Sequence, residues 1–506
     1  MPYVDFISGD DRVSLWYITN TNTCNASSFD PLKPTIILLH PLFLDSTWLN
    51  TQMEDPRLNK FYNMVALDLR ASGKSNSSLT GAHDCWVNAA DLAFFHRALQ
   101  LPPSHIFAVE SVSTNIALRF AALVDARFPE MCLGLVLVNV PPPSELDWVV
   151  DLYAEIARMW CYPEDLNEFE HACLEMSHHF LGNDCQPDLQ DEVKINLCPG
   201  RQLTNLQTQI IADWATKSPP WRRSRLYETM QCMLNRIPLH PEVLASITQP
   251  TLIIQAERTA MNPVRFANEL AEQLVNVEGG AKVHVIKGSP EYVTVVPSCA
   301  SIVNRVVAEF LSRQTHTANP VDDQSAKSTV ERMEAALARL SKLAHDPSIA
   351  ARDPRSPLSF SCVAPELRIS QYEQLRKCRE DEKDAFSPLG QDGRPVRKFS
   401  ERQRDHWFNA EDDGHSSTGV FDTLEDFKIN RTLSIVPALP DIKRGTKRIR
   451  PATLQISTPT NYLSSDPPSA TTIRRHRSST IPRQAVEIAG VTLTAMRPLP
   501  ISKMVR

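Results

Sequence analysis

A short apolar run that passes directly into a helical pattern, over residues 105–121, constrains this chain more than any other stretch. Its first part, 106–109, is uninterruptedly apolar and predicts a buried strand. Its second part carries apolar residues at helical spacing, and these are Ile116, Ala117, Phe120 and Ala121. Ser111 lies at the junction. A serine on such a sharp turn has its hydroxyl exposed above a sheet edge, at the N-terminus of a helix, as a nucleophile requires.

The residues around Ser111 fit this turn only in part. The turn favours glycine two positions before and two positions after the serine, because large side chains do not fit there. Here these positions hold Val109, which is branched and crowded, and Ser113, which is small. A second register exposes Ser113 and puts Ser111 and Asn115 at the flanks, but it shifts the following Ala-Leu pair by two positions. We therefore prefer Ser111.

Strand and helix patterns alternate along the first part of the chain. Continuous apolar runs typical of strands buried on both faces lie at 34–39, 62–70, 106–109, 133–139, 250–255 and 282–286. Helical patterns lie at 84–100, 263–275 and 297–313. This alternation predicts an α/β protein with a doubly wound, mostly parallel sheet. Residues 144–240 carry helical patterns only, and we expect them to form a helical cap over the carboxyl edge of the sheet.

Charge and proline content divide the 506 residues into two regions. Residues 315–506 are rich in proline and hold 30 Lys and Arg against 24 Asp and Glu, a net charge of +6. The remainder, 1–314, holds 53 − 30 = 23 Lys and Arg against 59 − 24 = 35 Asp and Glu, a net charge of −12. We predict a folded domain over 1–314. The tail, 315–506, buries too little apolar surface to offset its ordering entropy, so we expect it to be mostly disordered with one helix at 328–344.

Cysteine usage and the chain's apolar runs indicate the compartment. The 11 cysteines are scattered without a Cys-x-x-Cys pair, which favours reduced intracellular thiols over a disulfide framework or a zinc site. The first residues lack the basic and apolar regions of a secretory signal. No run approaches the roughly 20 apolar residues that span a membrane. We expect a protein of the cytoplasm or the nucleus, with no membrane span.

The basic tail carries motifs of its own. Residues 443–450 hold five Lys or Arg and resemble a nuclear-import patch or a nucleic-acid-binding arm. Residues 474–479 resemble a substrate of a basophilic kinase, and proline-directed phosphorylation sites are suggested at Ser356, Ser387 and Thr458. We expect the tail to bind a protein or a nucleic acid. The alternative is that these basic runs are only solvated chain.

Five short motifs, in this order, resemble the α/β-hydrolase fold superfamily over about residues 34–313. His40-Pro41 stands where the family has the His-Gly loop that supplies an oxyanion-hole amide, and Val112 follows the nucleophile. The other four are similar to the Asp-x-Arg-x-x-Gly-x-Ser turn, the nucleophile elbow, the acid-bearing segment and the histidine-bearing segment, at 68–75, 109–113, 255–263 and 286–292. The resemblance implies a serine hydrolase fold with an oxyanion loop at His40, Pro41 and Val112.

The departures from the family fall on the catalytic positions. The resemblance places the nucleophile at Ser111, the acid at Thr259 and the histidine at Glu291. A serine hydroxyl is a weak nucleophile until a base takes its proton. A glutamate with an ordinary pKa of about 4.3 is a poor base at neutral pH unless burial raises that pKa. The matched positions therefore provide no chain from acid through base to serine.

Other residues could substitute for the missing base or acid. His284 lies on the last predicted strand, and His178 and His179 lie in the predicted cap, from which a lid side chain can reach a site. Asp147 could replace the acid. Each also has a simpler interpretation, as a structural histidine or as a solvated aspartate at the start of a helix. Glu110 is expected at the mouth of the site or in solvent.

Two functions remain open from the sequence. The first is a catalytically silent homologue that binds a small molecule under the cap, or a protein. The alternative is a serine hydrolase of esters, amides or similar small substrates, with a base recruited from the cap. Neither requires a cofactor or a metal ion. A histidine within hydrogen-bond reach of the Ser111 hydroxyl would distinguish the second function from the first.

Overall fold

The structure is a computed structural model of the chain. It describes residues 2–9, 11–124, 131–181, 195–198, 201–203, 205–314, 329–390, 485–488 and 491–494. The chain divides into two compact units, Met1–Arg404 with Arg483–Arg506, and Asp405–Pro482. The second unit lies outside the described residues, and so do the basic motifs at 443–450 and 474–479 and the candidate phosphorylation site at Thr458. The account below concerns the first unit.

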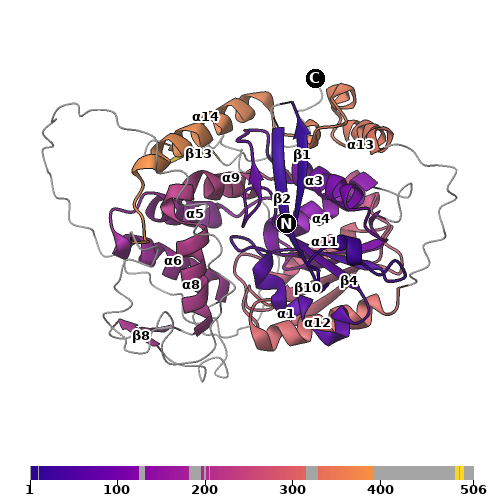
Figure 1. Cartoon of the computed structure of the whole chain (residues 1–506), viewed down its shortest axis with the longest axis horizontal. Coiled ribbons are helices and arrows are strands. Elements are labelled where there is room, and N and C mark those ends of the chain that lie inside the picture. The colour runs from indigo at the N-terminus through magenta and orange to yellow at the C-terminus, as the bar shows by residue number, and fades with distance from the viewer. Residues whose placement is uncertain are drawn as a thin grey trace, which may run out of the picture. The chain divides into compact units, whose positions relative to one another are not determined.

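A nine-stranded sheet forms the centre of this unit (Figure 1). Its strands are β1 (Tyr3–Ser8), β2 (Asp11–Thr19), β3 (Thr35–Leu39), β4 (Asn63–Leu67), β5 (Asn76–Ser77), β6 (Ser104–Val109), β7 (Gly134–Val138), β10 (Thr251–Ala256) and β11 (Lys282–Ile286). They lie in the order β1-β2-β4-β3-β6-β7-β10-β11, with β5 beside β2. All pairs from β4 to β11 are parallel, while β1 and β2 run antiparallel to their neighbours. The predicted mostly parallel sheet is confirmed.

Helices cover both faces of the sheet, which is why its central strands are continuous apolar runs. Every residue of β3, β4, β6, β7 and β10 is buried. On one side α3 packs against α4, and on the other α1 and α2 pack against α12 (Figure 1). The helices that surround the sheet are α1 (Asn50–Met53), α2 (Pro56–Asn59), α3 (Cys85–Ala98), α4 (Glu110–Val124), α10 (Pro241–Ala245), α11 (Val264–Gln273) and α12 (Pro297–Leu311).

A helical cap is inserted between β7 and β10, as predicted. Its helices are α5 (Asp147–Cys161), α6 (Leu166–Leu181), α8 (Asn205–Lys217) and α9 (Arg223–Leu234). A buried aromatic cluster holds them together, with the Trp160 ring centroid 5.0 Å from that of Trp214 and 6.2 Å from that of Phe169. The cap also contains a short antiparallel pair, β8 (Ile195–Cys198) and β9 (Arg201–Leu203), where the sequence predicted helices only.

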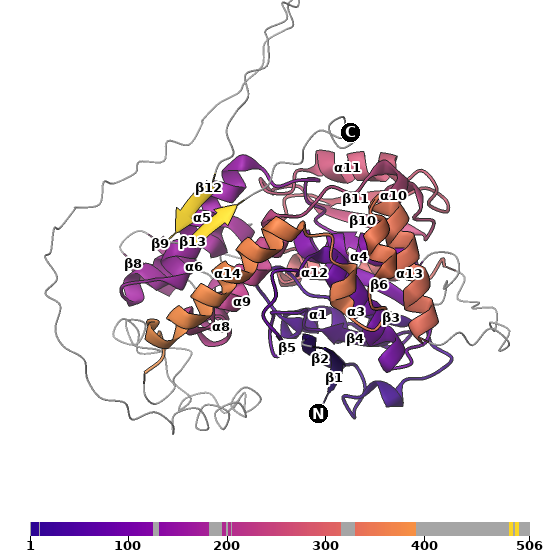
Figure 2. The same cartoon turned by 90° about the horizontal axis from the view of Figure 1, so that it is seen from above.

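Residues 329–390, here called the extension, fold onto the hydrolase-like domain (Figure 2). Their helices are α13 (Thr329–Leu343) and α14 (Pro365–Asp381), and α13 occupies the place of the helix predicted at 328–344. Leu340 and Phe360 are fully buried, and α13 packs against α4 while α14 packs against α9. The folded part thus reaches residue 390, although the sequence predicted mostly disorder after 314. Apart from α13, the buried apolar residues of the extension, such as Phe360 and Cys378, are few and follow no repeat, and they pack against segments that are distant in the sequence.

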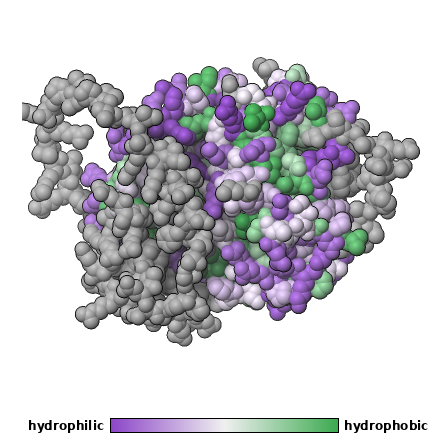
Figure 3. All heavy atoms as spheres, in the orientation of Figure 1, coloured by the Kyte–Doolittle hydropathy of each residue, from purple (hydrophilic) through white to green (hydrophobic). Residues whose placement is uncertain are grey.

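Several shorter elements complete the described chain. They are the 3-10 helices η1 (Ala26–Ser28), η2 (Ser46–Leu49), η4 (Pro220–Arg222), η6 (Pro347–Ala351), η7 (Pro357–Phe360) and η8 (Glu382–Asp384), and the antiparallel strands β12 (Ala485–Ile488) and β13 (Val491–Thr494). On the face shown in Figure 3, apolar groups form small patches among polar ones. No described helix combines the length and the apolar character that crossing a membrane requires.

Candidate active-site cavity

The junction of β6 and α4 has the strained backbone of a nucleophile elbow. Ser111 has φ 30° and ψ −96°, and Glu110 before it has φ 63°. Residues other than glycine rarely adopt positive φ, so the surrounding packing must hold the turn in place. Val109 is fully buried in β6, and the Ser113 hydroxyl donates to the backbone oxygen of His40 at 2.8 Å. The small residue expected at position 113 therefore ties the elbow to the loop after β3.

The loop after β3 is held by the His40 ring. Its Nε2 accepts a hydrogen bond from the Leu69 amide at 3.1 Å, so the proton resides on Nδ1, which donates to the Pro41 oxygen at 2.9 Å. Both nitrogens of a neutral imidazole are thus used, and His40 is structural. Pro41 has no N–H to offer an oxyanion. Val112 lies in the first turn of α4, where backbone amides have no partner within the helix.

The predicted acid and histidine positions meet each other. Glu291 is 1% exposed, and its two carboxylate oxygens accept hydrogen bonds from the Thr259 hydroxyl and the Asn262 side-chain amide. The Asn139 side chain donates to the backbone oxygen of Glu291. Burial raises the pKa of Glu291 to about 7, although the two donors act to lower it. The sequence did not predict Asn262 as a site residue. Its position three residues after Thr259, in the same loop, was the one feature that could have indicated it.

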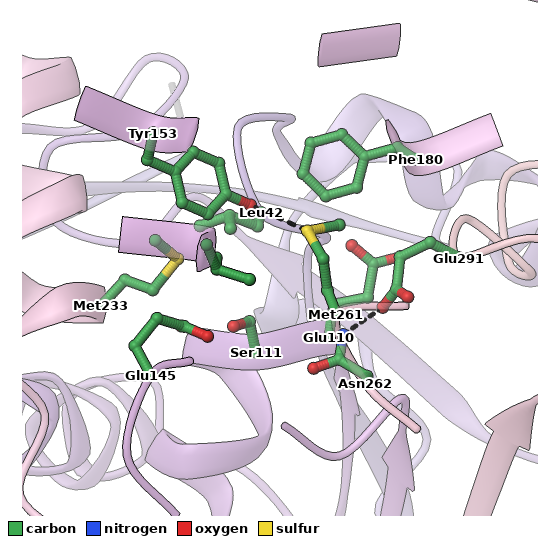
Figure 4. Close-up of a pocket in the computed structure, with 11 residues that line it drawn as sticks. Leu42, Glu110, Ser111, Glu145, Tyr153, Phe180, Met233, Met261, Asn262 and Glu291 are labelled. Carbon is green, nitrogen blue, oxygen red and sulfur yellow. Dashed lines mark hydrogen bonds between the residues drawn. The ribbon is translucent and has the colours of Figure 1, made fainter. Parts of the chain in front are cut away.

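A small cavity lies beside Ser111, between the sheet edge and the cap (Figure 4). It has an empty volume of about 260 Å³. Eleven residues line it: Leu42, Glu110, Ser111, Glu145, Val149, Tyr153, Phe180, Met233, Met261, Asn262 and Glu291. None of them is a histidine. Among the described residues, no side chain is hydrogen-bonded to the Ser111 hydroxyl, and the titratable groups that share its cavity are carboxyl groups and a phenol.

The order of the parallel strands, with an antiparallel β2 and a strained serine after the central strand β6, decides the architecture. The chain has the α/β-hydrolase fold. In this fold the cap and the carboxyl ends of the strands enclose the site, and the Ser111 cavity occupies that place.

Several solved structures are similar to this α/β-hydrolase-fold chain. A bromoperoxidase from Bacillus anthracis is 16% identical, with a TM-score of 0.45, over 61% of this chain and 99% of the bromoperoxidase. The enol-lactonase from Burkholderia xenovorans LB400 is 15% identical, with a TM-score of 0.44, over 62% and 100%. An esterase from Thermogutta terrifontis is 16% identical, with a TM-score of 0.47, over 62% and 100%. No protein-family model and no curated protein matches the sequence.

Three glutamates give the cavity of this α/β-hydrolase fold an acidic lining. Glu110 is 1% exposed, and its carboxyl group has no hydrogen-bond partner among the described side chains, although the backbone amide of Leu42 acts to lower its pKa. Burial, with a smaller contribution from nearby Glu291, raises the pKa of Glu110 well above its usual range. Of the two positions expected for Glu110, the solvent-exposed one is wrong, because its buried side chain lines the cavity beside Ser111. Glu145 forms an ion pair with Arg236 at 2.5 Å.

None of the suggested substitute residues lines the cavity. His178 and His179 lie near the end of α6 and are half-buried, and burial lowers the pKa of His179. His284 lies on the edge strand β11, opposite Ile254, and Asp147 is the exposed first residue of α5. The titratable groups that the cap contributes to the lining are Glu145 and Tyr153. The phenol of Tyr153 donates to the Met261 sulfur at 3.5 Å (Figure 4).

A histidine that the sequence did not single out, His83, lies buried near the elbow. Its Nδ1 lies 2.9 Å from a carboxylate oxygen of Glu228, and its Nε2 lies 2.9 Å from the Asn88 amide nitrogen. His83 lines a second cavity, with an empty volume of about 340 Å³, together with Val112 and Ser113. Both ring nitrogens have partners, so His83 does not supply a base to Ser111.

Proposed function

We propose that this protein is a catalytically silent α/β-hydrolase homologue that binds a small molecule beneath its cap. One observation carries the proposal: among the residues that the structure describes, no histidine lines the Ser111 cavity, and the residue at the histidine position, Glu291, is hydrogen-bonded to Thr259 instead. Without a base the serine hydroxyl is a weak nucleophile. Pro41 and Val109 further weaken the oxyanion loop and the elbow.

The lining of the cavity selects for the charge of its ligand. The ionisable side chains along it are three carboxyl groups and one phenol, Glu110, Glu145, Glu291 and Tyr153. Burial raises the pKa of Glu110 and of Glu291, so these carboxyl groups are partly or wholly protonated at neutral pH and donate hydrogen bonds to a neutral ligand or ionise beside a cationic one. An anionic ligand lacks a free cation here, because Arg236 is paired with Glu145. Glu110 offers its buried carboxyl group, and Tyr153 and Phe180 offer aromatic faces for a cation.

A binding and turnover comparison tests this proposal. The full chain and its Ser111→Ala variant are incubated with an activated ester, and we expect equal rates. Thermal unfolding is then followed with short primary amines and with carboxylates of the same length. We expect the amines to raise the unfolding temperature and the Glu110→Gln variant to lose that effect. Turnover that depends on Ser111, or stronger stabilisation by the carboxylates, contradicts the proposal.

A second candidate is a serine hydrolase in which Glu291 itself acts as the base. Its support is the pKa of about 7, which suits a general base at neutral pH. Glu291 would have to exchange its bonds to Thr259 and Asn262 for one to Ser111. This candidate predicts a turnover that rises as pH passes 7 and disappears in Glu291→Gln. A base from the cap finds less support, because Glu145 is paired with Arg236.

A further inference from the structure

Three potential metal ligands lie together where the extension meets the hydrolase-fold domain. They are His240 and Glu242, on either side of the first residue of α10, and His345, which follows α13. One ligand atom from each lies within 4.8 Å of the other two. The rings of His240 and His345 meet edge to face, with 5.8 Å between their centroids. The cluster therefore joins two segments that are far apart in the sequence.

The lone pairs of this cluster are largely free. The Glu242 carboxylate and the His345 ring make no hydrogen bond or ion pair with other described residues. The Nδ1 of His240 accepts a hydrogen bond from the Glu242 amide at 3.3 Å, which is longer than a usual N–H···O bond. Coordination through either ring nitrogen gives up this bond, since a ring that binds a metal through Nε2 carries its proton on Nδ1.

His345 occupies the left-handed turn that ends α13. The Asp346 amide donates to the Ser341 oxygen at 3.0 Å and the His345 amide donates to the Lys342 oxygen at 3.3 Å, as in the common turn that ends a helix with one left-handed residue. His345 is that residue, with φ 53°. Glycine or asparagine is favoured there, because a larger side chain is strained. Histidine is among the residues that tolerate this conformation, and the turn holds its imidazole beside His240.

We propose that His240, Glu242 and His345 bind Zn²⁺ and thereby fasten the extension to the hydrolase-fold domain. Two imidazoles and one carboxylate are a ligand set that zinc accepts, with water in the fourth position. Zinc–nitrogen bonds of about 2.0–2.1 Å put tetrahedral ligands roughly 3.3 Å apart. The cluster closes to that spacing by rotating its side chains, which are half-buried for His240 and exposed for the other two.

Zinc titration of the untagged full chain, in competition with a chromophoric chelator at pH 7.5, tests the site. In His345→Asn, asparagine retains the preference for the left-handed turn, and in His240→Asn it retains the helix cap, so each variant removes an imidazole and keeps the backbone. The control is His171→Asn, an exposed histidine on α6. We expect one tight equivalent in the wild type and the control, and at least about tenfold weaker binding in the other two variants. Equal affinity in all four proteins, or no binding, overturns the proposal.

Limited trypsin digestion provides a second readout. Zinc at one equivalent should slow cleavage within 329–390 in the wild type and in His171→Asn, because it ties α13 to the domain. It should have no effect in His345→Asn. The protection should fade below about pH 6.5, where protons compete for imidazole. Equal protection of His345→Asn by zinc would show that the metal acts elsewhere and would overturn the assignment.

Discussion

Two regions of the site differ in how closely they match a serine hydrolase. They are the elbow after β6 and the pair of loops after β10 and β11. The elbow keeps its strained backbone, with Ser111 at φ 30°, although Val109 replaces the usual glycine. The two loops keep their places at the carboxyl edge of the sheet, but Thr259 and Glu291 now bond to each other. The elbow thus keeps the backbone geometry of a nucleophile turn, whereas the side chains at the acid and histidine positions differ from those of a serine hydrolase. The tight packing of β6 and α4 fixes the strain, whereas the acid and base depended on single side chains.

The largest expected effect concerns the loops and is a change of stability with pH. The folded state keeps a proton on Glu291 up to about pH 7, while the unfolded chain releases it near pH 4.5, so stability falls as pH rises through this window. We expect the free energy of unfolding of the wild type to fall by about 3 kcal/mol more than that of Glu291→Gln between pH 4.5 and pH 8. Urea unfolding at several pH values measures this difference.

Glu269→Gln is the matched control, because Glu269 is an exposed glutamate on the neighbouring helix α11. Its profile should run parallel to that of the wild type. If the Glu291→Gln profile also runs parallel to the wild type, the loops do not hold a buried proton, and the contrast with the elbow weakens.

The second largest expected effect comes from changing the loops so that they act with the elbow again. Thr259→Asp with Glu291→His restores the acid and the base beside an elbow that retains its geometry. We expect roughly 10²-fold faster ester hydrolysis than in the wild type, about 2.7 kcal/mol in the barrier. This is less than the about 10⁴-fold effect of one triad residue in a working protease, because Pro41 and Val109 remain. The same pair in a Ser111→Ala background is the control. No gain over that control would mean that the elbow has lost its competence as well.

The smallest effect concerns the elbow alone. Val109→Ala removes two buried methyl groups from the end of β6 and should destabilise the protein by about 2 kcal/mol. Its rate of ester hydrolysis should stay at the wild-type level, since the missing base limits the reaction. Chemical unfolding and an ester assay on the same sample measure both quantities. Turnover restored by this change alone would identify crowding at the elbow as the defect.

Much of the fold could be predicted from the sequence, because buried strands are continuous apolar runs and the elbow joins one of them to a helix. The extension could not: Phe360 and Cys378 are fully buried by packing against distant segments, and no local repeat marks them. The burial of Glu110 could not be predicted either, because it depends on tertiary packing. A polar residue directly after a strand is ordinarily expected to be exposed. That Thr259 and Glu291 lie together follows from their strands being neighbours, but their direct bond needed the structure.

The central claim is that Ser111 lacks a base and is therefore unreactive. Incubation of the full chain with a fluorophosphonate at pH 6, 7 and 8, followed by intact and peptide mass spectrometry, tests it most directly. The account predicts that the wild type, like Ser111→Ala, acquires no adduct at position 111 over hours at any of these pH values. A stoichiometric adduct on Ser111 in the wild type, absent from Ser111→Ala and forming faster as pH rises through 7, would contradict the claim and favour Glu291 as a working base.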